Sequence, residues 1–248
     1  MTGRRLAALL LFDLVAILIV AGLVSLAVWQ VHRRAWKLDL IARIEARVHA
    51  APTAAPGPER WPDVSAASDE YRRVTVTGRW LQDRSALVQA LTEFGGGFWV
   101  LTPLVRDDGT TVLVNRGFVP TEKRDPAFWR PTDEGDVAVT GLLRLPEPGG
   151  GFLRSNDPAA DRWFSRDVAA ISASRGLTQV APFFIDAQRV PGVTGLPAAG
   201  LTVLSFNNNH LVYAITWSVL ALMSAAAAIF VNLDVLRNGR LRPRLREA

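Results

Sequence analysis

The 248-residue sequence contains no cysteine and only three histidines. Without cysteine the chain has no disulfide bonds, no thiolate metal sites and no thiol nucleophile. The histidines are His32, His49 and His210, and none of them lies in the central part of the chain, where strand-like patterns dominate. Metal-dependent hydrolysis and Ser-His catalysis are therefore not expected, and the sequence does not predict an enzyme or a metal site.

Charged residues are almost absent from two long stretches. Leu6–Val28 contains a single ionisable residue, Asp13, and Leu211–Val231 contains none. About 20 apolar residues at roughly 1.5 Å each cross a hydrocarbon core about 30 Å thick. We therefore predict transmembrane helices at residues 6–30 and 207–232. The first run is longer than the apolar region of a secretory signal, about 7–15 residues, so an uncleaved anchor is expected.

The net charge of +5 is concentrated in the two tails. Residues 1–5 and 233–248 carry seven arginines against two acidic residues. The positive-inside rule places such tails in the cytoplasm, although Arg33, Arg34 and Lys37 flank the long central domain. We expect both termini in the cytoplasm of a bacterial cell, a multi-pass protein of the inner (plasma) membrane, and an extracytoplasmic domain. That domain is nearly neutral, which argues against binding to nucleic acid.

The hydrophobic period changes along the segment between the two apolar runs. Residues 31–50 have helical spacing and predict a juxtamembrane amphipathic helix, and the Pro- and Ala-rich residues that follow predict a semi-rigid linker over 51–69. From Tyr71 to Trp80 apolar and polar side chains alternate, as in a half-buried strand, and residues 70–206 are predicted to form a β-rich domain. The fold class expected is membrane α + β: two transmembrane helices flanking an antiparallel β-barrel or sandwich-like domain. No internal repeat and no heptad array is apparent.

Strands and turns are predicted as follows. The pattern Asp108-Gly109 predicts a hairpin turn, Gly95–Gly97 predicts a loop, and Arg166–Arg175 predicts a short helix that ends at Gly176. The predicted strands are Tyr71–Trp80, Ser85–Leu91, Phe98–Val105, Thr111–Val119, Val137–Leu145, Phe183–Asp186 and Leu201–Phe206.

Asn115 and Arg116 interrupt an apolar strand, and Gly117 indicates a bulge or a close approach of another backbone. One interpretation is an edge strand with outward polar residues. The other is that Arg116 pairs with the carboxylate of a partner or with a propionate, since the guanidinium fork suits bidentate acceptors. The other carboxylates of the domain are interpreted as solvated turn residues.

His210 follows three asparagines at the start of the second apolar run. A neutral imidazole is a haem ligand, and the unperturbed pKa of histidine, about 6.5, leaves it available near neutral pH. Alternatively, Asn207, Asn208 and Asn209 cap the helix together with His210. His32, just beyond the first run, is a candidate second haem ligand. Asp13 is interpreted as a hydrated or tail-paired carboxylate near the cytoplasmic face.

Several motifs follow one another in order along almost the whole chain. They are Trp29-Gln30-x-x-Arg33-x-x-x-Lys37, Tyr71-Arg72-Arg73-Val74 with Gly78, Thr102-Pro103-Leu104, Val114-Asn115-Arg116-Gly117-Phe118-Val119-Pro120, Gly141-x-x-Arg144-x-Pro146-Glu147, and Asn208-Asn209-His210-Leu211-x-Tyr213-Ala214-x-Thr216-Trp217. This ordered set resembles the surfeit-locus-one (Shy-type) family, although Ala27 and Phe118 depart from its usual glycine and tryptophan.

The resemblance implies an assembly factor for haem–copper cytochrome c oxidase. Its partners would be the catalytic subunit of the oxidase, other oxidase assembly factors and the lipid bilayer, and haem a would be a transient cofactor contacting His210. The alternatives are a membrane-anchored interaction domain of another envelope complex, without haem, and an anchored hydrolase that uses carboxylates. The motifs also give candidate interaction residues, namely Trp29, Gln30, Arg33, Asn115, Asn209, Tyr213 and Trp217.

Overall fold

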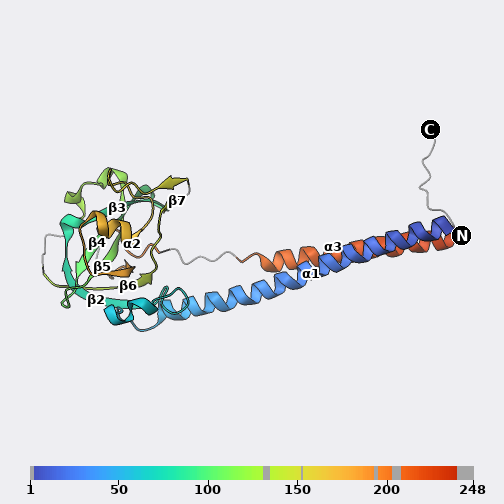
Figure 1. The fold of residues 1–248 in the computed structure, drawn as a ribbon, viewed down its shortest axis with the longest axis horizontal. Helices are drawn as coiled ribbons and strands as arrows, with labels where there is room; N and C mark the ends of the chain where they lie inside the picture. Colours follow the sequence, from blue (N-terminus) through green and yellow to red (C-terminus); the bar gives the residue numbers. More distant parts are fainter. Residues whose placement is uncertain (1–2, 131–134, 152, 193–194, 203–207, 239–248) are drawn as a thin grey trace. The chain divides into compact units, whose positions relative to one another are not determined.

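The computed structural model of the protein describes residues 3–130, 135–151, 153–192, 195–202 and 208–238 (Figure 1). Its contacts divide the chain into two compact units. Met1–Ala42 and Ser205–Ala248 form one, the helical unit, and Arg43–Leu204 form the other, the barrel unit.

The helical unit consists of α1 (Gly3–His49), up to Ala42, and α3 (His210–Asn238). Both helices are long and apolar enough to cross a membrane, as predicted. The two lie side by side (Figure 1), and α1 continues without a break through residues 31–49, which were predicted as a juxtamembrane amphipathic helix.

The side chains through which α1 and α3 contact each other, here called the seam, follow a heptad period that the sequence does not reveal. The less exposed positions recur at alternating spacings of three and four residues, which is the 3.5-residue period of a coiled coil. On α1 they are Leu9, Asp13, Ala16, Val20, Leu23, Ala27 and Gln30, and on α3 they are His210, Ala214, Trp217, Ala221, Ser224, Ala228, Val231 and Val235, with Ala225 and Asn232 also half-buried next to them.

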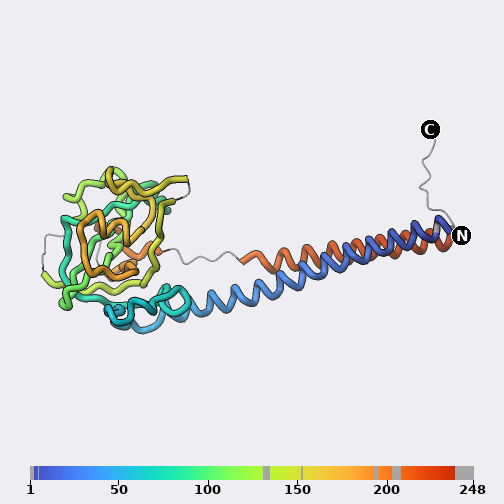
Figure 2. The backbone as a smooth tube through the Cα atoms, in the orientation of Figure 1, coloured from blue at the N-terminus to red at the C-terminus, as the bar shows by residue number. Residues whose placement is uncertain are grey.

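The barrel unit is built on one curved sheet with the strand order β1-β2-β6-β9-β5-β4-β3, and β2 pairs with β4 as well. That pairing closes β2, β6, β9, β5 and β4 into a ring, and Figure 2 shows the backbone winding around its interior. The β5–β9 and β1–β2 pairs are parallel, so the domain is a mixed barrel and not the purely antiparallel one expected. The strands are β1 (Thr53–Ala54), β2 (Arg73–Trp80), β3 (Ala86–Thr92), β4 (Gly95–Val105), β5 (Thr111–Pro120), β6 (Val137–Arg144) and β9 (Val180–Ala187).

Short elements complete the unit. The helix α2 (Val168–Ser174) begins at the N-cap Asp167, whose side chain accepts a hydrogen bond from the Ala170 amide, and it confirms the predicted short helix. The others are β7 (Gly150–Gly151), β8 (Arg154–Ser155), η1 (Pro58–Asp63), η2 (Gln82–Arg84), η3 (Thr121–Lys123) and η4 (Pro126–Phe128).

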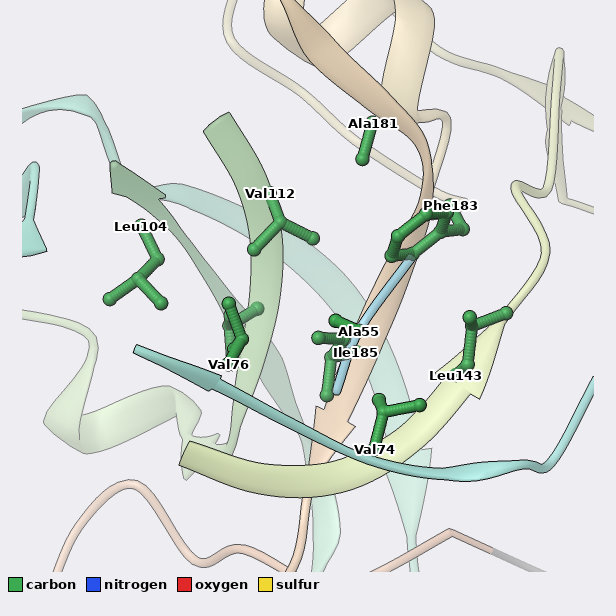
Figure 3. Packing of buried hydrophobic residues seen from close by; sticks show 10 residues of the cluster. Ala55, Val74, Val76, Leu104, Val112, Leu143, Ala181, Phe183 and Ile185 are labelled. Atoms are coloured by element: carbon green, nitrogen blue, oxygen red, sulfur yellow. The ribbon is translucent and has the colours of Figure 1, made fainter. Parts of the chain in front are cut away.

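The core fills the barrel interior with aliphatic and aromatic side chains from alternate strand positions. Figure 3 shows one cluster, in which side chains from β2, β4, β5, β6 and β9 point toward one another. A second cluster surrounds Trp163, which is fully buried against α2, β3 and β4. Burying each such side chain contributes about 1.5–3 kcal/mol relative to leaving it in water.

The segment predicted as a linker, residues 51–69, is part of the barrel unit. Thr53 and Ala54 pair with β2, and Ala55 is buried in the core. Arg47, in the last turn of α1, donates a hydrogen bond to the Glu70 carbonyl at 3.1 Å. Pro-rich composition indicated a spacer, but the backbone of β2 offered hydrogen bonds that only the tertiary structure reveals.

Three further predictions from the sequence differ from what the structure shows. Gly95–Gly97 is not a loop but the start of β4, and a Cβ on Gly97 would meet the Val119 carbonyl oxygen at 2.2 Å, so glycine allows the close packing of β4 on β5. The strand β5 lies between β4 and β9, so the edge-strand interpretation of Asn115 and Arg116 is wrong. Leu201 and Thr202 are not in a strand, and the rest of the predicted strand Leu201–Phe206 lies outside the described residues.

Candidate functional site

The helical unit brings His210 and Gln30 together. His210 is the first residue of α3, and its Nδ1 atom lies 2.7 Å from Oε1 of Gln30 on α1. An amide oxygen only accepts hydrogen bonds, so the Nδ1 atom carries the proton and donates it. In that tautomer the Nε2 atom keeps its lone pair, which is the arrangement by which a second residue orients a histidine that binds a metal.

The other predicted residues of α1 point elsewhere. His32 lines an apolar recess of about 420 Å³ with Val28, Ser218 and Leu222, and in the described part of the unit no hydrogen bond joins it to His210. Gln30, not His32, is therefore the α1 residue that meets His210. The Trp29 side chain is exposed, and the Arg33 guanidinium lies 4.0 Å from the centre of the Trp36 ring.

At the start of α3 the hydrogen bonds involve the backbone and not the asparagine side chains. The Asn209 carbonyl accepts a hydrogen bond from the Tyr213 amide, and among the described residues the Asn208 and Asn209 side chains make no hydrogen bond to the helix. The Oδ1 atom of Asn208 is buried without a partner, two residues before His210. Side-chain capping, the simpler interpretation of this stretch, is thus not what Asn208 and Asn209 do, and Asn207 lies outside the described residues. Tyr213 is exposed and Trp217 lies in the seam.

A second polar pair joins α1 and α3 at the other end of the two helices. The Asn232 side chain of α3 donates a hydrogen bond to Oδ1 of Asp13 at 2.7 Å. The carboxylate of Asp13, which was expected to be hydrated or paired with a tail, therefore accepts a hydrogen bond from an amide on the neighbouring helix. A hydrogen bond of this kind between apolar helices typically contributes about 0.6–2 kcal/mol.

Inside the barrel unit, Asp186 at the end of β9 is the centre of a buried charge network. Its side chain is only 4% exposed and accepts hydrogen bonds from four groups. The donors are Asn115 at 2.8 Å, Arg144 at 3.1 Å, Thr202 at 3.2 Å and Arg166 at 3.3 Å. Asn115, proposed from sequence as a surface contact, is instead buried in this network.

A second carboxylate, that of Glu147, completes the network. Burial by itself would raise the pKa of Glu147, but the hydrogen bonds and charge of Arg166, together with the charge of Arg144, outweigh it and lower that pKa. Burial opposes the charge of Arg166 as well, yet its two carboxylate partners raise the pKa of the guanidinium. Both arginines are thus paired with carboxylates within the fold, and a small pocket of about 200 Å³ lies beside them.

The comparisons with known proteins decide the family. A family model described as "SURF1 family" matches residues 17–222. Surfeit locus protein 1 of Homo sapiens is 35% identical over 223 residues, covering 82% of this chain and 71% of the human protein. Surfeit locus protein 1 of Xenopus tropicalis is 34% identical over 220 residues (81% and 69%), and a SURF1-like protein of Monosiga brevicollis is 34% identical over 225 residues (84% and 82%).

The chain belongs to the SURF1 family. The match includes Gln30, the barrel unit and His210. The contact between His210 and Gln30 and the buried network around Asp186 therefore both lie within the region that this chain shares with the SURF1 family. The predicted resemblance is thereby confirmed.

Sequence reasoning missed the role of three residues of this SURF1-family chain. Asp186, Arg144 and Arg166 form the buried network, although every carboxylate of the domain had been interpreted as a solvated turn residue. One signal was available. Asp186 follows the apolar run Phe183-Phe184-Ile185 directly, and an acid at the end of a buried strand needs a cationic partner.

Proposed function

We propose that this SURF1-family chain is an integral-membrane assembly factor for haem–copper cytochrome c oxidase that assists maturation of the catalytic subunit and catalyses no reaction. Family membership is the observation that carries the proposal. Both helices would cross the cell inner membrane with the tails in the cytoplasm and the barrel unit outside. The lengths and apolar composition of α1 and α3 support this, and so do the arginines of the tails.

Haem a is proposed as cargo that the helical unit holds in transit. The His210 Nε2 atom, left free by the hydrogen bond from Nδ1 to Gln30, would supply an axial ligand. The unpartnered Oδ1 of Asn208 offers an acceptor next to it. His32 stays a candidate second ligand without a contact that supports it, and a propionate contact by Arg116 stays a prediction.

A second candidate function is a membrane-anchored interaction domain of another envelope complex, without haem. Its support comes from apolar side chains at the β3–β4 turn. Leu91 is 87% exposed and Phe94 is 57% exposed, and large apolar groups gathered at one turn are typical of surfaces that contact a partner protein.

Deletion of the gene tests the oxidase proposal. We expect isolated membranes of the deletion strain to contain less haem a and to show lower cytochrome c oxidase activity than those of the parent, and a plasmid copy of the gene to restore both. Haem a content and oxidase activity that do not change on deletion would contradict the proposal. Recovery of other envelope proteins, but no oxidase subunit, with the tagged chain would favour the second candidate.

A further inference from the structure

One pocket of the described barrel residues is lined by Arg116, and its shape and chemistry can be considered apart from the predicted propionate contact. Its volume is about 470 Å³, within the range of about 300–1,000 Å³ typical of small-ligand sites. It lies between the end of β2, the start of β6 and the segments that follow β9. The lining residues that matter for its chemistry are Trp80, Arg116, Val139, Arg189, Val190 and Leu196.

Arg116 contributes a buried cation to this pocket. Its Nη2 atom donates to the Trp129 carbonyl at 3.3 Å, but its Nη1 atom is buried with no hydrogen-bond partner. The guanidinium carbon lies 5.2 Å from the centre of the Trp80 ring. Among the described residues no carboxylate forms an ion pair with Arg116, and burial lowers its pKa to about 10, which still leaves it charged at neutral pH.

The neighbouring arginines show how unusual this is. Arg144 and Arg166 are also mostly buried, and each has carboxylates within hydrogen-bond distance. A buried charge that lacks a partner costs several kcal/mol. One weak hydrogen bond to a neutral carbonyl and one ring contact do not offset that cost, so the fold itself gives no reason for a guanidinium at this position.

The rest of the pocket indicates what would satisfy Arg116. Arg189 adds a second, exposed cation, and none of the described residues that line the pocket is acidic. Most other lining side chains are apolar or aromatic, including Trp80, Val139 and Leu196. A planar, singly charged anion carried on an apolar body matches both features, because the fork of a guanidinium binds a carboxylate through two parallel hydrogen bonds.

We propose that this pocket binds a carboxylate attached to an apolar group, with Arg116 as the anion-binding residue and Trp80, Val139 and Leu196 around the apolar part. The carboxylate has two sources, a small organic acid or the free C-terminus of a protein chain. The proposal goes beyond oxidase assembly and does not depend on haem binding.

Calorimetric titration of the purified full-length chain tests the site. The probes are 3-phenylpropionate with its neutral isostere 3-phenylpropanamide, and the peptide acetyl-Ala-Ala-Phe with a free or an amidated C-terminus. We expect saturable binding of at least one acid, and binding of the matching amide to be weaker by roughly 10- to 100-fold, since a charged hydrogen bond contributes about 1.5–3 kcal/mol. The small acid and the peptide identify the source. No binding of either acid overturns the proposal.

Variants assign the binding to Arg116. Arg116→Gln is expected to weaken acid binding to the level of the amide, and Arg116→Lys to give an intermediate affinity because the charge stays and the fork is lost. The matched control is Arg162→Gln, an exposed arginine outside the pocket, which should bind like the wild type. Full acid binding by Arg116→Gln would contradict the assignment.

Thermal unfolding separates a binding role from a structural one. Since no carboxylate among the described residues pairs with Arg116, Arg116→Gln should leave the melting temperature unchanged or raise it. A melting temperature lowered by more than about 5 °C would mean that Arg116 stabilises the fold, which contradicts the argument above. Ala138→Phe, at an exposed lining position, should also block acid binding without altering Arg116. None of these outcomes depends on oxidase activity, so failure here leaves the assembly proposal standing.

Discussion

Replacement of Asp186 by alanine is expected to lower the free energy of unfolding of the barrel unit by about 3–5 kcal/mol. The substitution removes the carboxylate that accepts four hydrogen bonds and leaves Arg144 and Arg166, whose side chains are 14% and 15% exposed, with less opposite charge. Glu147 still pairs with Arg166, but Arg144 keeps only longer contacts, with Glu70 at 3.8 Å and with Glu147 at 4.0 Å.

Denaturant unfolding of the full-length chain, followed by tryptophan fluorescence, measures the effect. The control is Asp136→Ala, which removes an equally short ion pair to Arg79 at a site where both side chains are about 70% exposed. Exposed pairs contribute about 0–1 kcal/mol, so this variant should unfold almost like the wild type. Equal losses in the two variants would show that burial of the Asp186 network does not set its contribution.

Gly117→Ala is expected to lower the free energy of unfolding by roughly 2–6 kcal/mol. Gly117 has a φ of +132°, and a Cβ there would lie 2.3 Å from the Ala198 carbonyl oxygen, which is a backbone atom that moves only with its segment. Strain in φ costs about 1–3 kcal/mol and forced overpacking about 1–3 kcal/mol. The paired hydrogen bonds between Phe118 and Ala198 would be disturbed as well.

Two other glycines separate these causes. Gly109 has a φ of +79°, and the space around an added Cβ is open. Gly109→Ala therefore measures the cost of the backbone strain alone, about 1–3 kcal/mol. Gly96→Ala has neither a positive φ nor a neighbour within 4 Å, and we expect a change within about 0.5 kcal/mol. The same unfolding assay applies, and a Gly117→Ala effect no larger than that of Gly109→Ala would contradict the close approach of Ala198.

Local patterns predicted most of the barrel strands. The Asp108-Gly109 turn is present, with a hydrogen bond from the Gly109 amide to the Arg106 carbonyl at 3.0 Å. Gly117 lies at a bulge in the pairing of β5 with β4, and the backbone of Ala198 approaches it closely. Its place inside an apolar strand indicated both possibilities. These features depend on residues within a few positions of one another, which is why sequence reasoning found them.

The features that were not predicted depend on residues far apart in the chain. The parallel β5–β9 pair, the packing of Ala55 into the core and the ion pair of Arg144 with Asp186 all join distant segments. In the helical unit the cause is different. Most residues of the runs Leu6–Val28 and Leu211–Val231 are apolar, so hydrophobic periodicity gives little information about which side faces the other helix, and the heptad seam is hidden in the sequence.

The residues of the candidate haem site were predicted from the sequence, but the hydrogen bond between them was not. Gln30 and His210 both occur in the family motifs, yet they are 180 positions apart and no pattern connected them. His32 was paired with His210 from its place at the end of the apolar run. On a helix, residues two apart point to nearly opposite sides, so Gln30 and His32 do not share the seam.

The most direct test of the account is the absorption spectrum of the full-length chain purified from cells that make haem a. We expect the wild type to show a haem band, Gln30→Leu to show a weaker one because the imidazole is no longer oriented, and His210→Ala to show none. The control Asn209→Ala, at an exposed position beside His210, should retain the band. A haem band of equal intensity in the wild type and His210→Ala would contradict the assignment of His210 as the ligand.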